Sequence, residues 1–374
     1  MGARNAAHPE GGGEPARARG RKGDREPAGG GARAGGREPV GGRDPAGGRG
    51  RRWMLAGGAV AVAAAAAGAA ALLAVAAPWS PSGTTGPGPD VLPSDAGRPS
   101  APAPVSALPP GFPDVSTTGV REGVTLRPSG TVEVTEDGAV VENLLVVDGI
   151  IDVKANDVTI RNVRITNDAQ FVQWGIIQNE GYGGLVVEDS EIFGNRRSAE
   201  KFASGISNHG GDITVRRVEI HSVTDGIVTS HGLIEDCYLH SPRLFEGDHT
   251  DMIQSVGGSQ LGLPLTIRHN TVINTENQTA AVFLSDGTGT GVVPVRHVRV
   301  EGNLLAGGGY TVYAGGLVAE GHSPAGIVIR DNVFSRQVWP DGGYYGPVSD
   351  FDPGAPGNVW SGNVWEDGGP VELE

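Results

Sequence analysis

A six-residue pattern recurs nine times after about Gly119 and restricts the fold more than any other feature. Each copy reads apolar, polar, polar or glycine, variable, any residue, apolar. The copies are VENLLV (141–146), IRNVRI (160–165), VEDSEI (187–192), VRRVEI (215–220), IEDCYL (234–239), IRHNTV (267–272), VEGNLL (300–305), IRDNVF (329–334) and WSGNVW (360–365). Successive copies begin 19 to 33 residues apart. Irregular periods of this length are typical of a solenoid with loops of varying length on one side.

Each copy contains two short alternating segments that point inward on the same side. In VTIRNVRI, Val158 and Ile160 share one face, as do Val163 and Ile165, but the two pairs are three residues apart. The two strands therefore turn a corner rather than form a hairpin, and equivalent strands stack in parallel, about 4.7–4.9 Å apart. An antiparallel sandwich is the alternative, but it needs reversed strands and turn signals every 8–12 residues or so. We therefore predict an all-β fold, a single-stranded right-handed parallel β-helix.

A second column of strands is predicted ahead of the first in each coil. Its members are GIIQ (175–178), GISN (205–208), GIVT (226–229), MIQS (252–255), VFLS (282–285) and TVYA (311–314). The side chains expected to point inward are Ile176, Ile206, Ile227, Ile253, Phe283 and Val312. An outer wall is then expected to carry Ser207, Gln254, Leu284 and Tyr313, with His209, Ser230 and Asp286 two residues further on.

The fourth position of the pattern faces the interior, and in the later copies it is asparagine. Buried amides need hydrogen-bond partners, and asparagines on successive coils can bond to one another and to the backbone of the bend. We predict a structural ladder of Asn270, Asn303, Asn332 and Asn363. The single cysteine, Cys237, excludes an internal disulfide and is interpreted as a small buried apolar residue.

The N-terminal part of the chain has a different composition. Residues 1–52 contain 12 Lys and Arg against 6 Asp and Glu and almost no large apolar side chains, which predicts a disordered basic arm in the cytoplasm. Residues 80–113 are rich in Pro, Ser, Gly and Ala, as in a flexible linker. The β-helix domain is assigned to 114–374. The chain as a whole has a net charge of −14, so the body is acidic and no nucleic-acid partner is expected.

An apolar run at 53–79 is long enough to span a bilayer and has a tryptophan at each end. The arginines before it favour a cytoplasmic N-terminus and place the C-terminal domain outside the cell. A single-pass signal anchor in the cell membrane is favoured because the preceding 52 residues are long for a leader. The alternative is a signal peptide cut after Ala74-Val75-Ala76, which would release a secreted protein. Arg51-Arg52 also resembles a twin-arginine export signal.

From about Gly119 to the C-terminus the chain resembles the right-handed parallel β-helix proteins of the pectate-lyase-like superfamily, in particular exported actinobacterial members. The segments that carry the resemblance are the opening coils, VTIRNVRI, SHGLIEDCYLHSPRLFEGDHTDMIQ, NQTAAVFLSDG and NLLAGGGYTVYAGG. The resemblance implies the fold, but the superfamily includes lyases, hydrolases, epimerases and non-catalytic surface proteins. The calcium-binding acids and the arginine base of pectate lyases cannot be mapped here. Asp248-His249-Thr250-Asp251 is similar to the Asp-Pro-His-Asp run of alginate epimerases but lacks the proline.

The densest polar cluster is RLFEGDHTDMIQ at 243–254, where a loop enters a strand. TDMI aligns with TDGI, so Asp251 and Asp225 should stack if their coils are adjacent. Two close carboxylates raise one pKa and can share a proton. The candidate catalytic residues are Asp251, His249, Asp225 and Arg243, with His249 as a proton carrier near neutral pH. The structural alternative is that the two aspartates only accept hydrogen bonds from backbone amides at the starts of their strands.

Further residues are assigned to ligands. Asp225, Asp248 and Asp251 are a candidate Ca²⁺ site because calcium prefers oxygen ligands. Candidate substrate-binding residues are Gln254, Tyr313, His209, Asp286 and Arg268, and the arginines Arg243 or Arg268 are expected to pair with a substrate carboxylate.

These residues predict an extracellular, monomeric, carbohydrate-active protein that acts on an acidic polysaccharide or cell-wall glycan. Cleavage by β-elimination is preferred to epimerisation or hydrolysis. It needs a cation, a base and an acid, and Arg243, His249 and Asp251 are the candidates for these roles. The alternative is a non-catalytic glycan-binding or structural protein of the cell surface. The two differ in whether Asp225, Asp251, His249 and Arg243 converge on one exposed groove.

Overall fold

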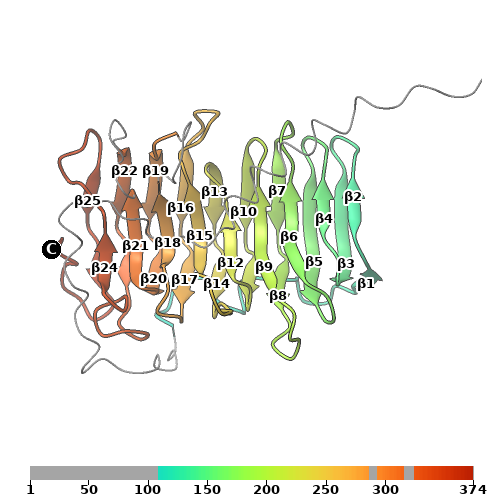
Figure 1. Cartoon of the computed structure of the whole chain (residues 1–374), viewed down its shortest axis with the longest axis horizontal. Helices are drawn as coiled ribbons and strands as arrows, with labels where there is room; N and C mark the ends of the chain where they lie inside the picture. Colours follow the sequence, from blue (N-terminus) through green and yellow to red (C-terminus); the bar gives the residue numbers. More distant parts are fainter. Residues whose placement is uncertain (1–107, 286–292, 316–323, 374) are drawn as a thin grey trace, which may run out of the picture. The chain divides into compact units, whose positions relative to one another are not determined.

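The computed structural model describes residues 108–285, 293–315 and 324–373 (Figure 1). The predicted arm (1–52), the apolar segment (53–79) and most of the linker lie outside the described residues. In the described ranges every regular element is a β-strand. No helix in this part of the chain has the length and apolarity needed to cross a membrane.

Nine strands form one parallel sheet in chain order, which is the predicted second column. They are β2 (Val132–Val134), β4 (Ile151–Val153), β6 (Val172–Gln178), β9 (Phe202–Asn208), β12 (Asp225–Val228), β15 (Asp251–Val256), β18 (Ala280–Ser285), β21 (Tyr310–Gly315) and β24 (Gly346–Ser349). Each strand pairs with the equivalent strand of the next coil.

The six-residue patterns form a 17-stranded sheet that bends along its length. Before the bend lie β7 (Leu185–Glu188), β10 (Ile213–Arg216), β13 (Gly232–Glu235), β16 (Leu265–Arg268), β19 (Arg296–Glu301), β22 (Ala325–Arg330) and β25 (Val359–Ser361). After it lie β1 (Arg127–Ser129), β8 (Glu191–Gly194), β11 (Glu219–His221), β14 (Tyr238–His240), β17 (Thr271–Asn274), β20 (Leu304–Gly307), β23 (Val333–Phe334) and β26 (Val364–Trp365). Two strands, β3 (Val140–Val147) and β5 (Thr159–Asn167), run through both halves.

Strands in both sheets pair in parallel, for example Ile160 with Val187 and Ile213 with Leu185. The predicted parallel solenoid is therefore confirmed, and the antiparallel sandwich is excluded. The inward side chains of the two sheets form one continuous apolar core along the stack.

The third position of the six-residue pattern makes the bend. All nine copies place a residue with positive φ there: Asn143, Asn162, Asp189, Arg217, Asp236, His269, Gly302, Asp331 and Gly362. Left-handed backbone is sterically costly for most L-residues and least so for Gly, Asn and Asp, which accounts for seven of the nine choices. Because one left-handed residue separates the two strands, both can direct apolar side chains into the same core.

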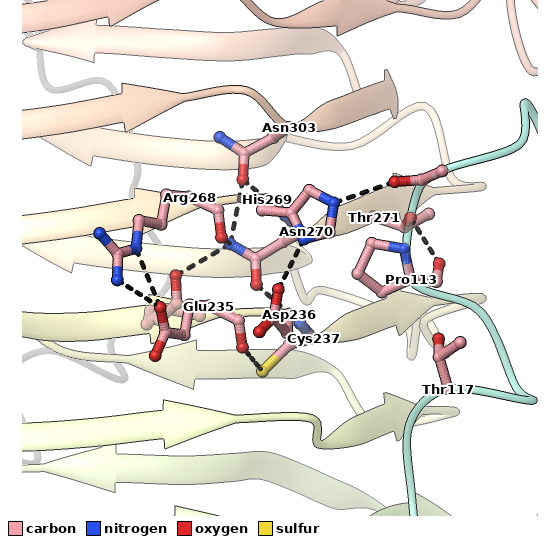
Figure 2. A network of polar contacts seen from close by, with 12 residues as sticks. Pro113, Thr117, Glu235, Asp236, Cys237, Arg268, His269, Asn270, Thr271 and Asn303 are labelled. Carbon is pink, nitrogen blue, oxygen red and sulfur yellow. Dashed lines mark hydrogen bonds and ion pairs between the residues drawn. The ribbon is translucent and has the colours of Figure 1, made fainter.

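The asparagine ladder lies just after this bend and is confirmed, and Figure 2 shows its first two members, Asn270 and Asn303. Asn270 Nδ2 donates to Asn303 Oδ1 at 3.0 Å, and the Asn303 and Asn332 amides donate to the next rung at 2.9 Å each. The same oxygens accept backbone N–H groups of the preceding coil, as in Asn270 N to Asn303 Oδ1 at 2.9 Å. Cys237 is fully buried at the end of the ladder, and its N–H donates to Asn270 Oδ1.

The register predicted for β18 is wrong by one residue. Ile253 pairs with Val282 and Gln254 pairs with Phe283, so Val282 points into the core and Phe283 faces outward. Leu284, expected on the outer wall, is fully buried. The run AAVFL is apolar throughout, and without alternation a strand gives no sequence signal for which face is buried.

The first described residues run along the outside of the 17-stranded sheet (Figure 2). Hydrogen bonds tie this segment to successive coils, from His269 Nε2 to Gly111 O (2.9 Å), Thr271 Oγ1 to Pro113 O (2.6 Å) and Gly119 N to Arg217 O (3.1 Å). The C-terminal end of the predicted linker thus contacts the solenoid.

Opposite charges alternate along the outer face of the 17-stranded sheet. One row crosses eight successive coils as Glu142, Arg161, Glu188, Arg216, Glu235, Arg268, Glu301 and Arg330. The arginines pair with the preceding glutamates at 2.7, 2.8, 2.6 and 2.6 Å. Parallel in-register stacking would be opposed by like charges directly opposite each other, so the alternation favours this register.

Reversing one charge in this row should destabilise the solenoid. Arg216→Glu puts three carboxylates on consecutive coils, and we expect a loss of about 1 kcal/mol in the free energy of unfolding that shrinks at high salt. Urea denaturation at low and high ionic strength measures it. Arg197→Glu makes the same charge change at an exposed arginine outside the row. Equal, salt-independent effects of the two variants would contradict the prediction.

Candidate functional site

The outer wall of the nine-stranded sheet carries polar and apolar side chains in two rows, three residues apart. One row contains Trp174, Ser204, Asp225 and Asp251, and the other Ile177, Ser207, Val228, Gln254, Phe283 and Tyr313. The hydroxyls of Ser204 and Ser207 lie 3.1 Å apart, as expected if both face the same side. Between the rows two consecutive residues point inward. A Cβ on Gly226 would clash with the backbone carbonyl oxygen of Met252 and meet the core side chain Leu239 at 2.9 Å, which is why glycine stands there.

Asp225 and Asp251 lie on adjacent coils, as predicted. Strand β12 pairs with β15, and the Asp251 N–H donates to Asp225 Oδ1 at 3.1 Å. Burial raises the pKa of Asp225 to about 7, and the Asp248 carboxylate adds to this effect. Burial, together with the charge of Asp225, raises the pKa of Asp251 well above its ordinary value. The pair therefore retains a proton near neutral pH.

The two carboxyl groups differ in access. Asp251 is fully buried, and its Oδ1 has no hydrogen-bond partner among the described residues. Its Oδ2 accepts a hydrogen bond from Gln254 Nε2 at 3.3 Å. Asp225 is partly exposed. A ligand on the outer wall can therefore contact Asp225, whereas Asp251 lies behind it.

Lys201 adds a cation to this site. Its Nζ lies 2.7 Å from Asp248 Oδ2, and both charges act on Asp225 and on His249. The His249 side chain is exposed to solvent. Partial desolvation lowers its pKa, so the imidazole is neutral at pH 7. A protonated carboxyl, a neutral imidazole and an ammonium group are thus gathered around Asp248.

Two loops carry these groups and are tied together by arginines. Lys201 ends the loop after β8, and Asp248 and His249 end the loop after β14. Arg196 donates to Ser241 O at 2.8 Å, and Arg243 donates to Asn195 O at 3.2 Å. Sequence reasoning missed Lys201 and Arg196, because only the stacking of coils brings residues some 45 positions apart into contact.

Arg243 and Arg268 do not take the place expected of them. Arg243 spans the two loops and stacks its guanidinium over Phe245 at 4.6 Å. Arg268 belongs to the 17-stranded sheet and pairs with Glu235 at 2.6 Å. The assignment of Arg268 to this site is therefore wrong, since an outward side chain of β16 cannot reach the outer wall of β15.

The remaining predicted ligand-binding residues are distributed along the wall. Gln254 is buried against Asp251, and Tyr313 packs on Phe283 with ring centroids 5.5 Å apart. His209 lies edge-on to Trp174 at 5.8 Å, and burial lowers its pKa. Asp286 lies outside the described residues.

The described residues contain no group of three or more His, Cys, Asp or Glu side chains placed to hold a metal ion. Asp248 is paired with Lys201, which removes one of the three charges assigned to calcium. The calcium site at Asp225, Asp248 and Asp251 stays a prediction.

The fold and this site define a parallel β-solenoid whose outer wall carries two aspartates with raised pKa values on adjacent coils. Comparison with protein-family models, with curated proteins and with solved structures finds no significant match.

Proposed function

We propose that this protein cleaves an acidic polysaccharide by β-elimination on the outer wall of the nine-stranded sheet. The observation that carries the proposal is the partly exposed Asp225, with a pKa of about 7, beside a neutral His249 and the Lys201 ammonium. Elimination next to a uronate carboxylate needs these three kinds of group: an acid, a base and a cation.

Each group has one role in the proposed reaction. Lys201 releases Asp248 and forms an ion pair with the uronate carboxylate instead. This ion pair makes the neighbouring C5 proton more acidic. His249 accepts that proton while the C4–O bond breaks and the C4–C5 double bond forms. Asp225 donates its proton to the departing oxygen. The role that the sequence suggested for Asp251 passes to Asp225, because a fully buried carboxyl group cannot contact the glycan.

Several wider features belong to the same proposal. Right-handed winding is supported by the strong preference of parallel crossover connections for that hand. Membership of the pectate-lyase-like superfamily, and exposure outside the cell through a membrane anchor at 53–79, rest on the sequence segments quoted above.

A non-catalytic glycan-binding protein is the second candidate. It is favoured by the aromatic rings of Trp174, Phe283 and Tyr313 along the same wall, since such rings pack against sugars. An enzyme and a binding protein differ in whether product is formed.

The test is the ultraviolet absorbance of unsaturated uronate products on a panel of acidic polysaccharides, with and without Ca²⁺. An increase in absorbance supports elimination. New reducing ends without absorbance indicate hydrolysis, and binding without either product supports the non-catalytic alternative. Dependence on Ca²⁺ would support the predicted metal site.

Removing the Lys201 charge should impair the reaction more than it impairs folding. We expect Lys201→Gln to lower kcat/KM about 100-fold, because the substrate carboxylate loses its cation. Lys154→Gln is the matched control, since Lys154 pairs with Asp152 at 2.8 Å on the same sheet but several coils away. Equal rates for Lys201→Gln and the wild type would remove Lys201 from the mechanism.

A further inference from the structure

A concave feature lies on the other sheet. A groove of about 480 Å³ lies over β19 and β22 of the 17-stranded sheet, between the segments that precede β16 and β25. It is lined by Gly262, Pro264, His297, Arg299, Gly326, Val328 and Gly357. None of these residues belongs to the aspartate site.

The groove forms where glycines leave space that larger side chains would fill. Arg299 pairs in register with Val328, and one row further His297 lies beside Gly326. Gly326 and Gly357 have φ of 66° and 77°, a backbone conformation that favours glycine. The floor is therefore flat and formed by backbone, with Pro264 and Val328 adding apolar surface.

The arginines at this groove outnumber the carboxylates that pair with them. Arg299 Nη1 lies 3.3 Å from Glu301 Oε1, while Arg330 holds the other oxygen of the same carboxylate at 2.6 Å. One glutamate thus serves two arginines. Arg296, next to the groove, makes no hydrogen bond or ion pair within the part of the chain described, and half of the Arg299 side chain is exposed (54%). This positive patch stands on a chain with a net charge of −14.

We propose that this groove is a second, non-catalytic site that binds the carboxylate group of an acidic glycan. Arg299 has guanidinium donors free for a carboxylate, which guanidinium recognises with paired hydrogen bonds. The flat glycine floor accepts the face of a sugar ring, and the apolar surface of Pro264 and Val328 contacts its C–H groups. The proposal shares its class of ligand with the proposed function but does not depend on catalysis.

The test counts binding sites by calorimetry on the full-length protein carrying Asp225→Asn, which slows turnover. The probe is a linear hexamer of uronic acid residues, with a neutral hexamer of the same linkage as the control ligand. Adding Arg299→Gln should remove one site or weaken it about tenfold, as expected for a lost charged hydrogen-bond pair. Arg161→Gln is the matched control, because Arg161 also pairs with a glutamate on the outer face of the same sheet but lies away from the groove.

The results separate this site from the aspartate site. Two sites reduced to one by Arg299→Gln support both proposals, and one site reduced to none supports the groove while counting against glycan binding at Asp225. Unchanged binding in Arg299→Gln, an equal loss in Arg161→Gln, or equal binding of the neutral hexamer would overturn the groove proposal. Binding of inorganic phosphate in place of the uronate hexamer would also overturn it, because the ligand would then be a phosphate.

Discussion

Asp225→Asn is expected to reduce the elimination rate by about 10²–10⁴-fold, the usual contribution of a positioned acid. The amide keeps the size of the carboxyl group and the acceptor oxygen for the Asp251 N–H, which lies 3.1 Å away in the wild type. It cannot give a proton to the leaving oxygen. Initial rates on the best substrate of the panel measure the effect, and thermal unfolding shows that the fold is intact.

Asp251→Asn is the matched control for this variant. Burial and the charge of Asp225 raise the pKa of Asp251 well above its ordinary value, which favours the protonated side chain, and asparagine resembles that uncharged form. We expect the variant to keep most of its activity. If Asp251→Asn is as inactive as Asp225→Asn, the assignment of the acid to Asp225 is wrong.

The pH dependence follows from the same group. The acid must be protonated, so the rate should fall as pH rises through about 7, the pKa of Asp225. The free energy of unfolding is expected to change with pH in the same direction as the rate. A carboxyl group whose pKa is higher in the folded than in the unfolded protein stabilises the fold at low pH, and this contribution is lost as pH rises from about 4 to 7. Asp225→Asn should therefore be more stable than wild type at pH 8 but not at pH 4.

Asn303→Ala is expected to lower the free energy of unfolding by about 2–4 kcal/mol, the largest stability effect predicted here. Asn303 stands in the middle of the ladder. Its side chain accepts from the N–H and the Nδ2 of Asn270 and donates to Ile267 O and to Asn332 Oδ1. Alanine leaves these groups buried without their partner, and hydrogen-bonded networks lose more than the mean of single bonds.

Urea denaturation measures this loss, and Asn277→Ala is the matched control. Asn277 is an exposed loop residue of the same type, where a change within about 0.5 kcal/mol is expected. A loss in Asn303→Ala no larger than in Asn277→Ala would show that the ladder adds nothing to stability.

Part of the candidate site was predictable. The repeated TD before an apolar strand predicted that Asp225 and Asp251 stack, and the register confirms it. Which of the two a ligand can contact was not predictable, because the burial of Asp251 depends on packing between coils that the local sequence does not show. Lys201 was missed for a related reason, since it reaches Asp248 only through the pairing of coils.

The sequence alone determined the winding of the chain into parallel coils. Its period-two segments, the left-handed residue between them and the asparagines after it are local or regularly repeated signals, and each acts within one coil or between neighbours. The tertiary structure decided what depends on register and on loops. The uniformly apolar β18 has no alternation to fix its face, and Arg268 was assigned to the wrong wall. A sequence repeat specifies that equivalent strands stack on successive coils. The side chains of a site are brought together by the irregular segments between the repeats.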